Sequence, residues 1–222
     1  MKAVLSSRTI SKIFGSPRCK KKFLEIINKN GKLLDVGCGD YSAYDTKMIC
    51  PNIFYTGIDI VDYNQQMPNM ADEYIITTPE KFAETIANSD KKYDTVISSH
   101  NLEHCNDREK TLEAMIKVLK PSGYLYLSFP CEGSIYFPAR KGTLNYYDDS
   151  THKGNPPDFI RIIQILIKNN MEIIFSSKSY KPFFTHKLGF LFELKSKQDR
   201  EVKHWAWAYW GFEAIIWAKK IK

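Results

Sequence analysis

A glycine-rich loop followed by an acidic residue offers the clearest chemistry in this sequence. The loop, Gly37-Cys38-Gly39, directly follows a short apolar run that ends in Asp35-Val36, and Asp59 ends the next apolar run. Glycines at such a turn let backbone N–H groups approach a ligand, and a carboxylate at about that distance accepts hydrogen bonds from the hydroxyls of a ribose. Together they predict a site for a nucleoside-containing cofactor. Taken singly, the glycines could form only a tight turn and Asp59 a helix cap.

The spacing of the glycines separates two kinds of cofactor. A nicotinamide site calls for Gly-x-Gly-x-x-Gly, and Ser42 occupies the third glycine position here. An NAD-dependent oxidoreductase is therefore the alternative and not the first interpretation.

A second pattern suggests a metal. His100-Asn101-Leu102-Glu103-His104 matches the His-x-x-Glu-His pattern of inverted zinc proteases, in which two imidazoles on one helical face bind the ion. Here the run follows directly on an expected strand, and the sequence identifies no third ligand. The prediction is that these residues bind no metal.

The elements that must position these residues alternate between strand and helix. The expected helices cover residues 18–28, 79–88, 107–119 and 158–168, and a further helix is expected to end near Pro51. The expected strands cover 32–36, 54–60, 73–77, 93–98, 124–129, 173–177 and 212–218. Such alternation predicts an α/β fold, a Rossmann-like, doubly wound, seven-stranded and mostly parallel sheet with helices on both faces. Ligands of such sheets bind beyond the carboxyl ends of the strands, where the glycine loop lies.

Two long segments, 131–157 and 181–211, interrupt this alternation. Long loops inside a compact domain are usually functional. Within the second segment Trp205, Trp207 and Tyr209 alternate with small residues, which predicts a strand with one buried face or, as the alternative, an aromatic wall for a ring-shaped ligand.

Four segments, in order, resemble the motifs of class I S-adenosylmethionine-dependent methyltransferases, in particular the small-molecule type 11 and type 12 group. They are Leu34–Gly39, Gly57–Ile60, Tyr93–His104 and Leu119–Leu125. The likeness covers about residues 18–130, and the order of strands and helices extends it further. It implies a single methyltransferase domain over residues 1–222, with acceptor-side insertions at about 131–157 and 181–211.

The resemblance also implies a cofactor, S-adenosylmethionine, with S-adenosylhomocysteine as product. The glycine loop would pack against its methionine and ribose portions, Asp59 would hold the ribose hydroxyls and Ile60 would flank the adenine. The residues expected at the cofactor are Arg18, Asp35, Gly37, Cys38, Gly39, Asp59, Ile60, Thr78, His100 and Leu102. Arg18 could instead be a surface cation, and Thr78 stands where the group often has an acidic residue near the adenine amine.

The expected catalytic residues are His152 and Asp149. The segment Asp148–Lys153 resembles the Asp-Pro-Thr-His element of many small-molecule and glycan methyltransferases of this group, with Ser150 in place of proline. An imidazole accepts a proton well near neutral pH, and Asp148 or Asp149 would orient it. Equally, the two side chains could only brace the loop.

The acceptor is expected to be a hydroxyl. No Asn-Pro-Pro-Tyr-like motif of amine-directed enzymes follows the fourth strand. A basic surface, the Tyr-rich insertion and the Asp148–Lys153 segment favour a sugar or sugar-phosphate, as in surface-polysaccharide assembly, with an anionic group near Arg140, Lys141 or Lys153. A non-sugar metabolite and a catalytically silent cofactor-binding partner protein are the alternatives.

Composition limits the other possibilities. The net charge of +7 is spread along the chain, which makes nucleic acid an unlikely partner. The five cysteines show no Cys-x-x-Cys spacing and fit reduced thiols in a cytoplasmic protein. No uninterrupted apolar run is long enough to predict a membrane span.

Overall fold

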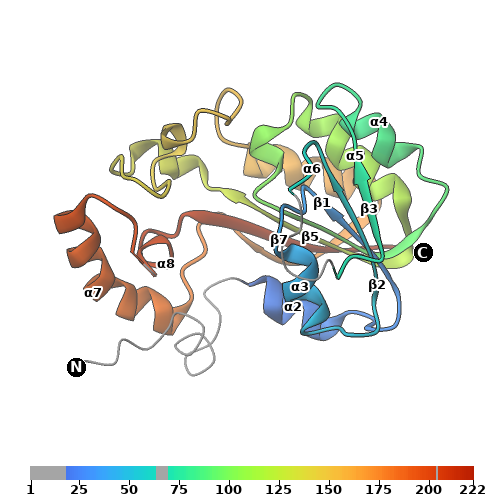
Figure 1. Ribbon diagram of the computed structural model, residues 1–222, viewed down its shortest axis with the longest axis horizontal. Helices are drawn as coiled ribbons and strands as arrows, with labels where there is room; N and C mark the ends of the chain where they lie inside the picture. Colours follow the sequence, from blue (N-terminus) through green and yellow to red (C-terminus); the bar gives the residue numbers. More distant parts are fainter. Residues whose placement is uncertain (1–18, 64–69, 204) are drawn as a thin grey trace.

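One mixed sheet organises the molecule (Figure 1). The computed structural model describes residues 19–63, 70–203 and 205–222, so Arg18 lies outside the described residues. Within them the strands run in the order β3-β2-β1-β4-β5-β7-β6. Their bounds are β1 (Lys32–Val36), β2 (Phe54–Asp59), β3 (Glu73–Ile76), β4 (Tyr93–Ser99), β5 (Leu119–Pro130), β6 (Met171–Ser177) and β7 (Glu213–Lys220). The expected seven-stranded, mostly parallel sheet is confirmed, since only β7 pairs antiparallel with its neighbours.

Helices cover both faces of the sheet, as predicted (Figure 1). One face carries α4 (Phe82–Ala87), α5 (Arg108–Val118) and α6 (Phe159–Lys168), and the other carries α2 (Lys20–Ile26) and α3 (Ser42–Lys47). Each face therefore has its own buried apolar cluster. The side chains of Asp107 and Asp158 cap α5 and α6 by accepting a hydrogen bond from a first-turn backbone N–H.

The prediction of a strand through Trp205, Trp207 and Tyr209 is wrong. The segment 181–211 folds instead into α7 (Phe183–Asp199) and the short helix α8 (Ala206–Trp210), which pack together. Ala206 and Ala208 face the interior, and Gly211, at φ 68°, ends the helix with its N–H on the carbonyl of Trp207. Five alternating residues span little more than one helical turn, so period two and period 3.6 are not separable over that length.

Pro121–Gly123, which the sequence places as a turn between the expected helix 107–119 and strand 124–129, form an irregularity inside a longer strand. β5 already begins at Leu119, opposite Tyr93, and its register with β4 shifts before Thr95 meets Tyr124. Ser122 adopts φ 63° within this bulge. These three residues therefore change the direction of the strand without ending it.

The strand order reverses between the neighbouring strands β1 and β4. From β1 the chain adds β2 and β3 toward one edge of the sheet, and from β4 it adds β5 toward the other. The glycine loop follows β1, and η1 (Leu102–His104), a short 3₁₀ helix, follows β4. Both connections leave from the carboxyl ends of parallel strands, the place where such sheets bind ligands. Among the described residues, no helix combines the length and the apolar character needed to cross a bilayer.

Candidate cofactor and acceptor site

A cleft opens at the reversal of the strand order. Its volume of about 1650 Å³ exceeds the roughly 300–1,000 Å³ typical of a site for one small ligand, so it can hold a cofactor and an acceptor together. Its walls include the glycine loop, Asp59 and Ile60 on one side, and His100, His104, Thr151 and Lys153 on the other.

The glycine loop needs its first glycine for two reasons. Gly37 adopts φ 73°, and a Cβ built there would lie 2.4 Å from Cγ of Asn101. Its N–H donates to the carbonyl of Ile58 at 2.9 Å, which fixes the loop against the end of β2. Gly39 also has a positive φ, 57°, but a Cβ there would meet no heavy atom within 4 Å. The backbone at Gly39 is thus open to a ligand.

Asp35 lies at the end of β1, next to the glycine loop. Its buried carboxylate accepts hydrogen bonds from the Tyr55 hydroxyl at 2.7 Å and from the Ser42 hydroxyl, and Lys20 lies 3.5 Å away. Burial, with the nearby charge of Asp35, raises the pKa of Tyr55, so its hydroxyl stays protonated and keeps donating. Tyr55 and Ser42 are positioning residues. The sequence motifs did not single out Tyr55, and they marked Ser42 only as the residue at the third glycine position.

Asp59 lies at the end of β2 and faces the same cleft. Its Oδ2 accepts the N–H of Gly39 at 2.8 Å and its Oδ1 accepts the N–H of Ile60 at 2.7 Å. Burial raises the pKa of Asp59, and the two backbone hydrogen bonds hold that rise back. Each oxygen keeps a lone pair for a further donor, which is what a ribose diol supplies.

The other predicted cofactor residues divide into two groups. Cys38 and Ile60 line the cleft, Cys38 buried and Ile60 exposed. Leu102 is buried in the core, and Thr78 is exposed beyond β3; neither is among the described residues that line the cleft. Their contacts with the cofactor stay predictions, as does that of Arg18.

His100 is held between two carboxylates. Its Nδ1 lies 3.1 Å from Oε1 of Glu103 and its Nε2 lies 2.8 Å from Oε1 of Glu213 on β7. Burial alone would lower the pKa of His100, but these hydrogen bonds raise it to about 9. The imidazole is therefore a cation at neutral pH and lines the cleft from the β4 side.

The insertion at 131–157 is fastened to η1. Arg108 donates to the carbonyls of Leu102 at 3.1 Å and of Asn155 at 2.7 Å, and the N–H of Lys153 donates to the carbonyl of Glu103 at 2.8 Å. This docking brings two residues together that lie far apart in the sequence, since the rings of His104 and His152 are 4.9 Å apart.

His152 is partly buried, with 5 % of its side chain exposed, and its Nδ1 hydrogen-bonds the carbonyl of Tyr146 at 2.6 Å. Its Nε2 lies 3.8 Å from Oδ2 of Asp149, so the expected pair is adjacent. Burial would raise the pKa of Asp149, yet hydrogen bonds from Thr151 bring it below its usual value. His104, not His152, lines the cleft. The catalytic roles of His152 and Asp149 stay predictions.

Arg140 is not among the described residues that line the cleft, and the anion contact expected of it stays a prediction. Its guanidinium donates to both carboxylate oxygens of Glu193 on α7 at 2.7 Å, and only 6 % of its side chain is exposed. Lys153 does line the cleft, together with Lys20 and Lys21 from α2.

A methyltransferase domain family matches residues 16–215, nearly the whole chain. The chain belongs to this family. Its sheet and cleft are those of class I S-adenosylmethionine-dependent methyltransferases, as the motifs predicted, and the cofactor is S-adenosylmethionine.

Three relatives show how varied the acceptors of similar methyltransferases are. A ubiquinone biosynthesis O-methyltransferase of Bartonella tribocorum is 28% identical over 105 residues, 45% of this chain and 41% of the relative. A ubiquinone/menaquinone biosynthesis C-methyltransferase of Pasteurella multocida is 29% identical over 125 residues, 50% of this chain and 46% of the relative. The aligned part thus spans less than half the length of these curated relatives.

The third relative shows the fold with the reaction product in place. It is the crystal structure of Burkholderia thailandensis 1,6-didemethyltoxoflavin-N1-methyltransferase with bound 1,6-didemethyltoxoflavin and S-adenosylhomocysteine. It is 11% identical, has a TM-score of 0.57, and the match covers 97% of this chain and 82% of that one. Names that include O-, C- and N-methylation leave the acceptor atom of this methyltransferase to be decided by its own site.

Proposed function

We propose that this methyltransferase transfers the methyl group of S-adenosylmethionine to a hydroxyl of a small-molecule acceptor. The observation that carries the proposal is the arrangement of the cleft: the glycine loop and Asp59 line one side, and His104 with the docked 149–153 loop lines the other. The proposal includes one methyltransferase domain over residues 1–222, with both insertions on the acceptor side.

The reaction is an in-line displacement at the methyl carbon. The hydroxyl oxygen forms the new O–C bond, the C–S bond breaks, and its electron pair stays on the sulfur of S-adenosylhomocysteine. Holding the two reactants in line supplies most of the catalysis in such a transfer. The structural contribution is therefore a rigid cofactor loop and an acceptor wall that is tied to η1 by Arg108.

We assign His152 as the base that removes the proton of the hydroxyl, with Asp149 beside it. Because Nδ1 donates to a carbonyl, Nε2 carries the lone pair, and Asp149 at 3.8 Å would stabilise the imidazolium that forms. The acceptor oxygen would have to enter past Thr151, which lines the cleft while His152 does not.

A sugar or sugar-phosphate is the proposed acceptor class. Lys153 lines the cleft beside Thr151, where it would pair with an anionic group of the acceptor. A non-sugar metabolite is the second candidate, because a curated relative is named for O-methylation in ubiquinone biosynthesis.

The test has two stages. Calorimetry with S-adenosylmethionine, S-adenosylhomocysteine and NAD should show saturable binding of the first two alone. S-adenosylhomocysteine formation is then measured with matched sugar, sugar-phosphate, phenolic and amine acceptors, using His152→Ala and, as the control, His186→Ala on α7. If His152 is the base, turnover with the best acceptor falls by about 100-fold or more. Full activity of His152→Ala would make the residue a brace, and methylation of amines alone would overturn the hydroxyl assignment.

A further inference from the structure

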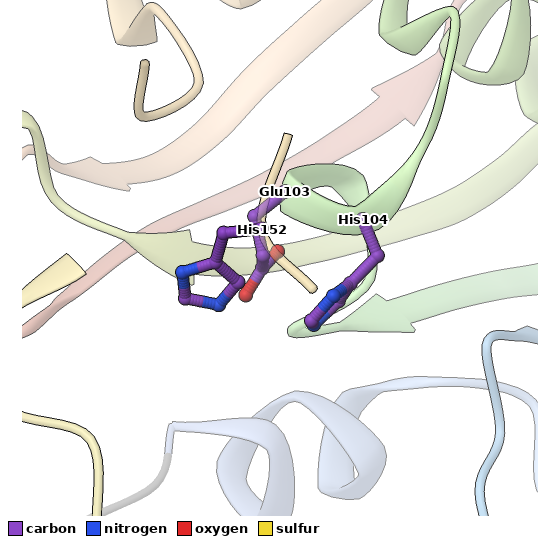
Figure 2. Close-up of side chains that lie close together, drawn as sticks. All are labelled: Glu103, His104 and His152. Atoms are coloured by element: carbon purple, nitrogen blue, oxygen red, sulfur yellow. The ribbon is translucent and has the colours of Figure 1, made fainter. Parts of the chain in front are cut away.

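Three potential metal ligands converge beside the cleft. Glu103 and His104 come from η1, His152 comes from the docked insertion, and one donor atom of each lies within 4.8 Å of the others. Figure 2 shows the carboxylate of Glu103 between the two imidazoles. His104 lines the cleft, so this cluster lies at its wall.

The hydrogen bonds around the two imidazoles fix where their lone pairs are. The Thr151 hydroxyl donates to Oδ1 of Asp149 at 2.6 Å and so accepts from Nδ1 of His104 at 2.9 Å. Nδ1 of His152 donates to the carbonyl of Tyr146 at 2.6 Å. In each ring Nδ1–H donates to a protein oxygen, so Nε2 carries the lone pair that can bind a metal.

One carboxylate oxygen of Glu103 has no hydrogen-bond partner among the described residues. Only 1 % of its side chain is exposed, and Oε1 is engaged by His100. Oε2 is buried with no hydrogen-bond partner among the described residues. Leaving a charged oxygen unsatisfied in the interior is costly, so an occupant that accepts electron pairs is expected next to it.

We propose that Glu103, His104 and His152 bind a divalent transition-metal ion of the zinc type at the acceptor side of the cleft. Two imidazoles and one carboxylate are a ligand set of catalytic zinc sites, which keep an open position for substrate or water. The carbonyl of Tyr146 and the Thr151–Asp149 pair supply the outer hydrogen bonds that orient metal-binding imidazoles. With metal–ligand bonds of about 2.0–2.2 Å, binding draws the most distant donors closer than they lie in this structure.

This set differs from the one that the sequence pattern suggested. In His-x-x-Glu-His the ligands would be His100 and His104, but both ring nitrogens of His100 are held by Glu103 and Glu213. The second imidazole comes instead from His152, which reaches the site only because the insertion docks on η1.

The role of the ion rests on the proposed function, whereas its binding does not. An acceptor hydroxyl on the open position would have its pKa lowered and lose its proton to water. The resulting oxygen anion then forms the O–CH₃ bond as the C–S bond breaks. With the ion bound, the Nε2 lone pair of His152 would be a metal ligand, so the role of His152 as proton acceptor would apply only to the metal-free protein.

The experiment measures metal binding without cofactor or acceptor. Chelator-treated full-length protein is titrated with Zn²⁺ and with Co²⁺, followed by calorimetry and by the visible spectrum of Co²⁺. We expect one ion per chain, affinity at least about 100-fold lower in His104→Asn and Glu103→Gln, and a loss of about 10–100-fold in Thr151→Val, which removes only an outer contact. His186→Asn, which removes an imidazole elsewhere, should bind as the wild type does.

Thermal unfolding of each metal-free variant shows whether it is folded, and Thr151→Val keeps the test valid if one ligand variant does not fold. Absence of stoichiometric binding by the folded wild type overturns the proposal. So does binding that His104→Asn, Glu103→Gln and Thr151→Val leave unchanged, because the ion would then sit elsewhere, for example on the cysteines. Failure of methyl transfer with intact metal binding would count against the proposed function alone.

Discussion

The two carboxylate oxygens of Asp59 accept backbone N–H groups, and the residue lines the cleft. Asp59 can therefore support the loop and accept hydrogen bonds from the ribose at the same time. Replacing Asp59 with Ala should lower the affinity for S-adenosylmethionine and S-adenosylhomocysteine by at least about tenfold, because hydrogen bonds to a charged group contribute about 1.5–3 kcal/mol each. Calorimetry measures the change. The exposed Asp90→Ala is the control, and an unchanged affinity in Asp59→Ala would refute the ribose assignment.

Gly37 and Gly39 form a matched pair for testing the loop. Both have positive φ, so alanine at either costs about 1–3 kcal/mol in backbone strain. Only Gly37→Ala adds an overlap with Asn101, whose Cβ at 2.5 Å prevents relief by side-chain rotation. That overlap lowers the free energy of unfolding of Gly37→Ala by about 1–3 kcal/mol more. Urea denaturation should therefore rank Gly37→Ala below Gly39→Ala in stability, and equal losses would show that the loop moves away from Asn101.

Between elements, the Arg140–Glu193 pair ties the 131–157 insertion to α7. Arg140 and Glu193 are 6 % and 10 % exposed, with both N–O distances at 2.7 Å. Glu193→Gln leaves a buried guanidinium without its carboxylate, at a cost of about 3–5 kcal/mol. The half-exposed Arg161–Glu109 pair is the control, and Glu109→Gln should cost at most about 1 kcal/mol.

The same pair predicts a pH dependence. Burial would raise the pKa of Glu193, but the hydrogen bonds from Arg140 bring it below its ordinary value of 4.5. The stabilisation by this ion pair is therefore complete above pH 4.5 and is lost as the pH falls through the folded-state pKa. Urea denaturation of wild type and Glu193→Gln should converge in acid, and a constant difference down to pH 3 would contradict the assignment.

Elements were predictable where a buried pattern was long or ended in a motif. β1 with its glycine loop and α6 with its apolar face could be inferred from local residues alone. α8 could not, because five alternating residues fit one helical turn as well as a strand. The meeting of His104 with His152 depends on Arg108 and on how the insertion docks, and no local pattern encodes that contact.

At the scale of the whole molecule, the cofactor site draws on β1, β2 and β4, so a ligand there should stabilise the sheet as a unit. S-adenosylhomocysteine at a concentration of 100 times its dissociation constant should raise the free energy of unfolding by about 2.7 kcal/mol. Each kcal/mol corresponds to about 2–4 °C in Tm for a domain of this size. Differential scanning fluorimetry should show one upward-shifted transition and no shift with NAD. A shift confined to part of a split transition would mean that the sheet does not unfold cooperatively.

The place of β7 also shapes how the chain matures during synthesis. β7 lies between β5 and β6 yet is translated after both. Until Glu213–Lys220 leaves the ribosome, one edge of β5 is unpaired and β6 has no neighbour in the sheet. Unpaired strand edges are templates for aggregation. Nascent chains stalled before this strand should depend on chaperones more than chains released after it.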